Sequence, residues 1–295
     1  MFFHKKGVVP SNKDFTKDDL PSDRKEQFFR ILKEEWKLLL LLCFFLLLLF
    51  APYLGVTIYG QYYLSAHEEV DQLAYSMMLE TIKAVSLILP FSAFGGLSKV
   101  YRRLYLDEGV LFWKDFFEGW HVLFALFGLL YGAIGMLLVY LSSLSGSFSF
   151  AGVFYFLVLG AFCLLVYPWF CFSLAQLPIY SYNRVRGYFS NGSKFALKHF
   201  LWMFLFALLP LAHYLLGFIP LPLVAYDIIL CLLAFLSPIY ELAFTGFAIS
   251  KFDLYLNKEN YPSLYKKGIK EDKKPEEETK EEDESKDTIE KEQKP

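Results

Sequence analysis

The chain has 295 residues, of which 55% are hydrophobic and 32 are Phe. This composition is too apolar for an ordinary soluble domain and favours a lipid bilayer as the solvent of the folded chain. The formal net charge of -2 conceals a segregation, since nearly all Lys and Arg lie at the N-terminus, in two internal loops and in the C-terminal tail. Such a pattern concerns membrane topology and gives no indication of a nucleic-acid partner.

The four cysteines, Cys43, Cys163, Cys171 and Cys231, all lie inside apolar stretches, where cysteine behaves as a small buried hydrophobe. We therefore expect no disulfide, no metal cluster and no cofactor. The first apolar run begins at Leu38, behind a long charged leader and without a small-residue cleavage site after it. It is expected to be a retained span and not a cleaved signal peptide.

Six stretches meet or approach the roughly 20 apolar residues that a helix needs to cross a bilayer. They cover residues 38–59, 73–96, 121–141, 150–177, 200–218 and 221–249. The predicted fold class is all-α, a polytopic membrane bundle of six transmembrane helices. Glu80 and Lys83 interrupt the second stretch, and the parity of the topology changes if that stretch does not span.

The positions of Lys and Arg test this count, because short cytoplasmic loops retain cations and translocated loops lack them. The leader carries Lys5, Lys6, Lys13, Lys17, Arg24, Lys25, Arg30, Lys33 and Lys37. The loop at residues 60–72 has no Lys or Arg and offers only His67, Glu68, Glu69 and Asp71, and the loop at residues 142–149 is uncharged. The loop between the second and third stretches carries Lys99, Arg102, Arg103 and Lys114, and the loop at residues 178–199 carries Arg184, Arg186, Lys194 and Lys198. This alternation predicts that both termini are cytoplasmic.

A weak internal repeat accompanies the spans, because a short amphipathic segment with cations and large aromatics precedes each odd-numbered span. The three segments contain Phe28, Phe29, Leu32 and Trp36; then Phe112, Trp113, Phe116, Phe117 and Trp120; then Lys194, Phe195, Leu197, Lys198, Phe200 and Trp202. Such segments are typical of helices that lie in the membrane interface. We therefore expect short interfacial amphipathic helices on the cytoplasmic side.

Each even-numbered span carries a proline in its cytoplasmic half, namely Pro90, Pro168 and Pro238. Because proline removes a backbone donor and kinks a helix, these positions predict three similar kinked hairpins. The alternative is that proline is simply commoner in membrane helices than in soluble ones, and the sequence leaves both open.

The charge pattern also divides the chain into three parts. Residues 1–37 are a cytoplasmic leader with an interfacial helix, and residues 38–256 are the six-span transmembrane domain. Residues 257–295 are expected to be a disordered cytoplasmic tail, since from Ile269 to the end there are seven Lys and twelve Asp or Glu with almost no apolar residue.

Ionisable side chains inside the spans are the candidate functional residues, because each costs about 2.5 to 3.5 kcal/mol at the bilayer centre on insertion scales. They are Glu80, Lys83, His213, Asp227 and Glu241. His213 and Asp227 lie near the short outer turn at residues 217–222 and can reach the outer interface. Glu241 lies near the cytoplasmic end of the last span, where arginines of neighbouring loops can neutralise it.

Glu80 and Lys83 are the deepest of these residues along their stretch, and their spacing of three places them on one face of a helix. One interpretation is a polar spot in a substrate or ion pathway. The others are a self-neutralised pair facing the bundle interior, or a second span that begins at Ala84 and leaves both residues at the outer surface.

No phosphate-binding loop, dinucleotide fingerprint, H-E-x-x-H or G-x-S-x-G motif occurs in the chain. The sequence therefore does not predict an enzyme. The leading hypothesis is a non-catalytic accessory or regulatory membrane protein whose partner, such as a transporter subunit, contacts it in the cytoplasm or in the bilayer. The alternative is a small-solute transporter whose pathway includes Glu80 and Lys83.

Residues 87–117 read LILPFSAFGGLSKVYRRLYLDEGVLFWKDFF. This stretch resembles the YesL family, also called DUF624, of multi-span bacterial membrane proteins. The matching positions are Pro90, Gly95, Arg102, Arg103, Glu108, Gly109, Phe112, Lys114, Asp115 and Phe116, whereas Ala93 and Gly96 stand where the family usually has Thr and often has Pro. The likeness covers roughly residues 38–249, and it implies a bacterial cytoplasmic membrane location and a link to carbohydrate uptake.

Overall fold

The computed structural model describes residues 20–67, 71–144, 150–181, 184–216 and 221–270, and within these ranges the chain is helical without strands. The α-helices are α1 (Arg24–Glu34), α2 (Trp36–Ala66), α3 (Gln72–Ser86), α4 (Ile88–Tyr105), α5 (Phe112–Glu118), α6 (Val122–Leu144), α7 (Phe150–Ala161), α8 (Tyr167–Ala175), α9 (Val185–Lys198), α10 (Phe200–Leu216), α11 (Leu223–Phe252) and α12 (Lys258–Asn260). Two π-helical segments, Phe162–Val166 and Asp253–Asn257, follow α7 and α11.

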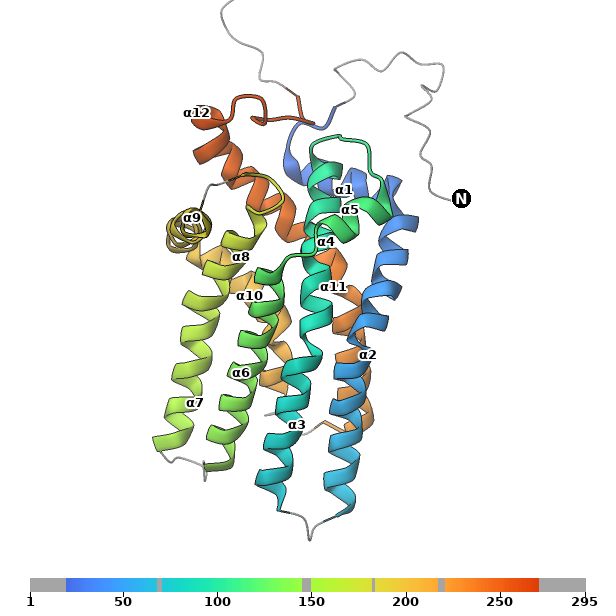
Figure 1. Cartoon of the computed structure of the whole chain (residues 1–295), viewed down its shortest axis with the longest axis vertical. Helices are drawn as coiled ribbons and strands as arrows, with labels where there is room; N and C mark the ends of the chain where they lie inside the picture. The colour runs from blue at the N-terminus through green and yellow to red at the C-terminus, as the bar shows by residue number, and fades with distance from the viewer. Residues whose placement is uncertain (1–19, 68–70, 145–149, 182–183, 217–220, 271–295) are drawn as a thin grey trace, which may run out of the picture.

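The long helices lie side by side along the long axis of the molecule (Figure 1). The short helices α1, α5, α9 and α12 gather at one end, where both ends of the described chain also lie. We call this the charged end, because Arg24, Arg102, Arg103 and Lys251 lie there. The last turns of α2, α6 and α10 and the first turns of α3, α7 and α11 lie at the opposite end, so each of these three pairs is antiparallel.

Five described helices are long and apolar enough to cross a membrane. They are Trp36–Ala66, Gln72–Tyr105, Val122–Leu144, Phe150–Ala175 and Leu223–Asn260. The second of them contains the predicted stretch interrupted by Glu80 and Lys83. The fifth predicted span corresponds to α10, which has 17 residues and is not among the five.

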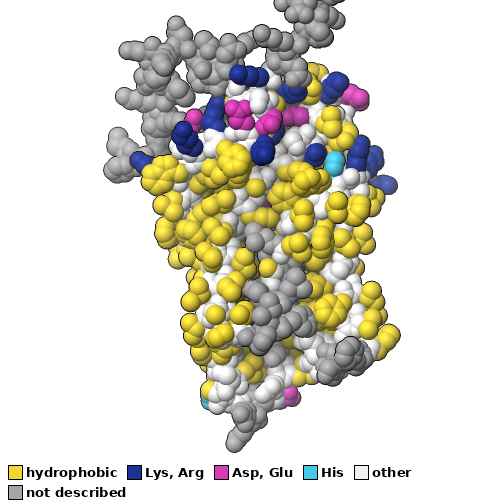
Figure 2. Space-filling model, turned by 180° about the vertical axis from the view of Figure 1, so that it is seen from behind, with side chains coloured by type: hydrophobic (Ala, Val, Ile, Leu, Met, Phe, Trp, Pro, Cys, Tyr) yellow, Lys and Arg dark blue, Asp and Glu magenta, His cyan; other side chains and the backbone are white. Residues whose placement is uncertain are grey.

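The sides of the bundle are strongly apolar. Figure 2 shows hydrophobic side chains over the middle of one face, with Lys, Arg, Asp and Glu concentrated toward the charged end. Large residues such as Phe44, Leu48 and Phe156 are exposed on these sides. An apolar surface this extensive is costly in water and favourable in lipid, in keeping with a membrane protein.

The three predicted proline kinks have different outcomes. Close to Pro90 the helix is interrupted between α3 and α4, and the π-helical turn Phe162–Val166 directly precedes the segment with Pro168. Pro238 lies inside α11, which continues through it. Proline lacks a backbone N–H and frees the carbonyl four residues earlier, so each site needs a substitute for that hydrogen bond.

The residues that carry the YesL-like pattern hold α4 against α5. A side-chain carbon at Gly95 would collide with the carbonyl oxygen of Gly119, so the two helices approach closely only with glycine there. Arg103 pairs with the buried Asp115 at 3.1 Å and donates to the carbonyl of Gly109 at 2.8 Å. Pro90 is buried in α4, and Arg102 pairs with Glu108 at 3.2 Å. These residues stabilise the turn between the helices.

Arg24 joins four segments at the charged end. Its side chain is only 6% exposed and pairs with Asp253 at 2.7 Å. The same guanidinium donates to the carbonyls of Tyr105 and Lys267, both at 2.9 Å. Breaking a buried pair leaves an uncompensated charge, so this contact ties α1 to the ends of α4 and α11 and to the segment after α12.

The segment after α11 packs against the rest of the chain as far as residue 270, within the range 257–295 that the sequence assigns to the tail. Asn257 is buried, where its amide donates to Asp253 at 2.8 Å and its carbonyl accepts from Tyr180 at 2.6 Å. Ile269 is 7% exposed, and the Lys270 N–H donates to the Pro21 carbonyl at 2.9 Å. Burial of the apolar Ile269 side chain stabilises this segment despite the charged residues around it. Residues 271–295 lie outside the described part.

Replacing Arg24 by Ala is expected to destabilise the fold by about 3 kcal/mol, because it strands the buried carboxylate of Asp253. The measurement is the free energy of unfolding of the purified protein in mild detergent. Lys25→Ala is the matched control, since Lys25 is the exposed neighbour of Arg24, and it should change stability by less than about 0.5 kcal/mol. Equal stability of both variants would contradict the role of Arg24.

Candidate binding cavity in the helix bundle

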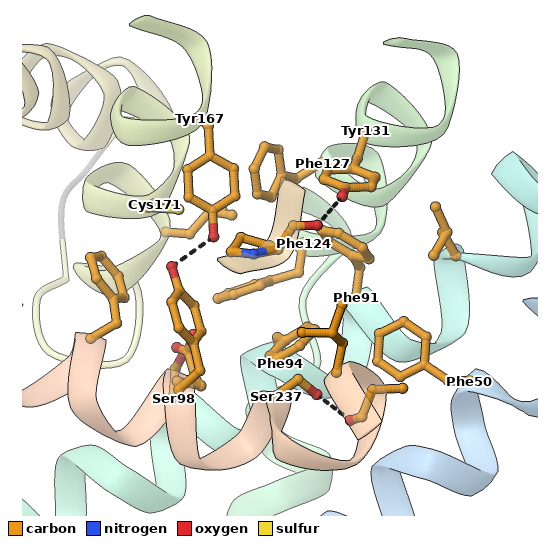
Figure 3. A pocket seen from close by; sticks show the side chains of 18 of the residues that line it. Phe50, Phe91, Phe94, Ser98, Phe124, Phe127, Tyr131, Tyr167, Cys171 and Ser237 are labelled. Atoms are coloured by element: carbon orange, nitrogen blue, oxygen red, sulfur yellow. Dashed lines mark hydrogen bonds between the residues drawn. The ribbon is translucent and has the colours of Figure 1, made fainter. Parts of the chain in front are cut away.

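A cavity of about 150 Å³ lies between the long helices. Its walls come from α2, α4, α6, α8, α10 and α11, together with Leu87 at the junction of α3 and α4. Ten aromatic side chains line it: Phe50, Tyr53, Phe91, Phe94, Phe124, Phe127, Tyr131, Tyr167, Tyr240 and Phe244. Figure 3 shows how side chains of different helices converge on this space. The cavity is therefore apolar on most sides.

Close contact between α4 and α6 builds one wall. A side-chain carbon at Gly128 would come within 2.8 Å of the Cβ of Phe91, so glycine makes room for this ring. Phe91 then contacts Phe127 and Tyr131, each with ring centroids 5.5 Å apart (Figure 3). Offset and edge contacts of this kind stabilise aromatic clusters, which fixes the orientation of the wall.

The tyrosine hydroxyl groups at the opposite wall form hydrogen bonds around a proline in α10. Pro210 has no N–H for the carbonyl of Phe206, and the Tyr240 hydroxyl donates to that carbonyl at 2.8 Å. Tyr240 has one hydroxyl proton, so in the 2.9 Å contact between the two hydroxyls Tyr167 is the donor (Figure 3). Tyr131 donates to the carbonyl of Pro210 itself at 2.6 Å. These hydroxyls therefore satisfy the backbone around the kink.

Pro238 in α11 is compensated in the same way. It leaves the carbonyl of Ala234 without its helical donor, and the hydroxyl of Ser237 donates to this carbonyl at 2.7 Å (Figure 3). All three residues belong to the part of α11 that faces the cavity or adjoins it. Hence α11 continues through Pro238 while its polar backbone stays satisfied.

Glu241 is the only Asp, Glu, Lys, Arg or His among the described residues that line the cavity. It lies about 27 Å along α11 from Leu223 at about 1.5 Å per residue. The hydroxyl of Ser98 donates to its carboxylate at 2.6 Å, and Thr245 one turn further on also forms a hydrogen bond with it. No arginine of the described loops pairs with Glu241, so the expected neutralisation by loop arginines is replaced by two hydroxyl groups.

Of the other sequence candidates, Glu80, Lys83 and Asp227 do not line this cavity. Glu80 and Lys83 form an ion pair with each other at 2.5 Å on α3 and are both largely buried. Asp227 is 9% exposed, and within the described residues its Oδ1 atom has no hydrogen-bond partner. The side chain of His213 lies outside the described part. Among the four candidates whose side chains are described, Glu241 alone lies in the cavity wall.

Sequence reasoning missed the hydroxyl groups of the site. Tyr131, Tyr167 and Tyr240 are uncharged residues within apolar stretches, and Ser98 is an uncharged residue just after one, so none of them is among the ionisable candidates. The signal available was their relation to proline: Tyr240 directly precedes Glu241 and follows Pro238 by two residues. Their pairing with α4, α8 and α10 depends on contacts 34 to 143 residues apart in the chain.

Comparisons of the chain with protein-family models, with curated proteins and with solved structures found no match. The chemistry of the site therefore rests on its own residues: aromatic faces, a few engaged hydroxyls and one carboxylate. Aromatic walls with a few polar groups are the kind of lining that can hold and orient a small molecule.

Replacing Tyr240 by Phe removes the donor to the freed Phe206 carbonyl and the acceptor for Tyr167. We expect the free energy of unfolding in detergent to fall by about 1–3 kcal/mol, because a buried polar group then lacks a partner. Tyr140→Phe on α6 is the control, since Tyr140 is 42% exposed, and it should be close to neutral. A Tyr240→Phe variant as stable as this control would show that the Phe206 carbonyl needs no donor.

Proposed function

We propose that this chain is a six-span integral membrane protein that binds a small solute in its central cavity and transports it. Both termini lie in the cytoplasm in this proposal, the membrane is the bacterial cytoplasmic membrane, and the three pairs of spans are kinked hairpins. The protein is non-catalytic and uses no cofactor. The single observation that carries the solute site is the cavity with Glu241 in its wall.

The position and length of α10 support the sixth span. A helix of 17 residues measures about 25 Å at about 1.5 Å per residue, within the range of transmembrane helices in a core of about 30 Å. Six crossings also agree with the location of both described chain ends at the charged end (Figure 1). The excess of Lys and Arg at that end favours the cytoplasmic side for it.

The cost of an ionisable residue inside a membrane supports a functional role for the cavity. A carboxylate in an apolar setting is expensive unless a cation or several donors compensate it, and such residues mark substrate and ion pathways in membrane proteins. Binding sites also occur between the helices of bundles, where aromatic walls and a few polar groups fix a ligand. Glu241 and its surroundings have these features. The self-paired Glu80 and Lys83, in contrast, are less suited to the pathway that the sequence suggested.

A second candidate function is a non-catalytic accessory or regulatory component of a transport system. The charged end supports this alternative, since α1, α5, α9, α12 and residues 261–270 form a folded layer there, beyond the ends of the long helices (Figure 1). The partner in this case is a transporter subunit that contacts the charged end. The YesL-like stretch 87–117 is the reason to propose relationship to that family and a link to carbohydrate uptake.

Replacing Leu233, which lines the cavity, by Trp is expected to fill the cavity and weaken ligand binding at least about tenfold. The probes are benzylamine and benzyl alcohol, and the measurement is calorimetric titration of the full chain in detergent. Leu232→Trp is the matched control: its neighbour Leu232 is 52% exposed on the outer surface, so this variant should bind like the wild type. If neither compound binds the wild type, the proposed solute site is wrong.

Uptake by reconstituted vesicles separates the two candidate functions. A transporter moves the bound compound into wild-type vesicles faster than the leak measured with Leu233→Trp vesicles, whereas an accessory protein shows the leak alone. Affinity purification in mild detergent supplies the complementary result, because only the accessory function predicts a reproducible transporter subunit.

A further inference from the structure

We infer that the ligand of the central cavity is a small organic cation, an ammonium group attached to an apolar group of about benzyl size, with its nitrogen at Glu241. This inference rests on the proposed function, since it names the class of solute for the same site. It follows from the charge of the cavity, from the state of its hydroxyl groups and from its volume.

The side chain of Glu241 bears the one carboxyl group among the described residues that line the cavity, and none of those residues is Lys, Arg or His. Glu241 has no ion-pair partner among the described residues, although it lies deep between helices. The structure supplies it with hydrogen bonds from Ser98 and Thr245, an arrangement suited to a carboxylate, which accepts hydrogen bonds from hydroxyl donors. Two neutral donors do not balance a full charge in an apolar medium. A cation in the adjoining cavity would complete the site.

The walls beside Glu241 are suited to an organic cation. The faces of aromatic rings attract ammonium groups, by about 2 kcal/mol or more when the contact is dry, and aromatic side chains from α4, α6, α8 and α11 surround the cavity (Figure 3). A positive group at this place therefore meets both a carboxylate and ring faces. These rings give a neutral group only ordinary apolar contacts.

The hydroxyl groups argue against a metal ion or a sugar. The protons of Tyr131, Tyr167 and Tyr240 are already engaged with backbone carbonyls or with one another, and Ser237 is engaged with Ala234. Ions such as Ca²⁺ or Mg²⁺ are held mainly by carboxylate and carbonyl oxygens, and the described lining has a single carboxylate. A sugar needs partners for each of its hydroxyls on burial. An ammonium group attached to an apolar group needs few hydrogen-bond partners.

The volume limits the size of the cation. An engineered apolar cavity of about 150 Å³ in another protein holds benzene, and the cavity here has about the same volume. Benzylamine, protonated at neutral pH, and benzyl alcohol differ at one terminal group and have nearly the same shape. The first is a model of the inferred class, and the second is its neutral counterpart.

The test compares the affinities of these two compounds for the full chain in detergent at neutral pH. We expect the wild type to bind benzylamine at least about tenfold more tightly, because a charge-assisted hydrogen bond and cation–π contacts are available only to the cation. In Glu241→Gln the two affinities should agree within about twofold. Glu259→Gln, which removes an exposed carboxylate outside the cavity, should keep the wild-type preference.

Each outcome decides one part of the proposal. Binding of benzyl alcohol as tight as that of benzylamine by the wild type would overturn the cation class while leaving the solute site intact. A preference that survives in Glu241→Gln would remove this carboxylate from recognition. Absence of binding of either compound to the wild type would overturn the proposed function as well. The wild-type comparison needs no variant, so it decides the class even if Glu241→Gln does not fold.

Discussion

The interior of this bundle depends on one constraint: inside a bilayer no water is available for a backbone group that lacks its helical partner. Pro210 and Pro238 each free a carbonyl, and the side chains of Tyr240 and Ser237 donate to those two carbonyls. The side chains that donate to these carbonyls, the hydroxyl-bearing ring of Tyr240 and Ser237, also line the central cavity. The cavity is thus a consequence of how α10 and α11 tolerate their prolines.

The same constraint gives Glu241 its importance. Two other pairs are neutralised within the protein: Lys83 pairs with Glu80 on α3, and Arg24 pairs with Asp253 at the charged end. Glu241 has only the hydroxyls of Ser98 and Thr245, and it lines the aromatic cavity. The bundle satisfies the carbonyls freed by Pro210 and Pro238 and leaves the carboxylate of Glu241 beside a space that fits a ligand. Ligand binding would then complete the electrostatics of the fold.

The all-helical class and the apolar helices follow from the sequence, because apolar runs and the segregation of Lys and Arg are local properties. The role of Arg24 does not follow from the sequence, since its partners Asp253 and Lys267 are 229 and 243 residues away. In the sequence Arg24 is one cation among the many of the leader. Ser98 likewise acquires its role through a partner 143 residues distant. The contacts of the buried Asn257 and Ile269 also do not follow from composition, because the sequence around them is charged and polar.

The central claim is that Glu241 carries a negative charge opposite a bound cation. Isotope-edited infrared spectroscopy of the full chain in lipid vesicles measures this directly, with a Glu241→Gln sample to identify the band of this residue. When benzylamine saturates the site, the account predicts that Glu241 absorbs as an ionised carboxylate. A Glu241 band that remains that of a protonated carboxylic acid with benzylamine bound would contradict it.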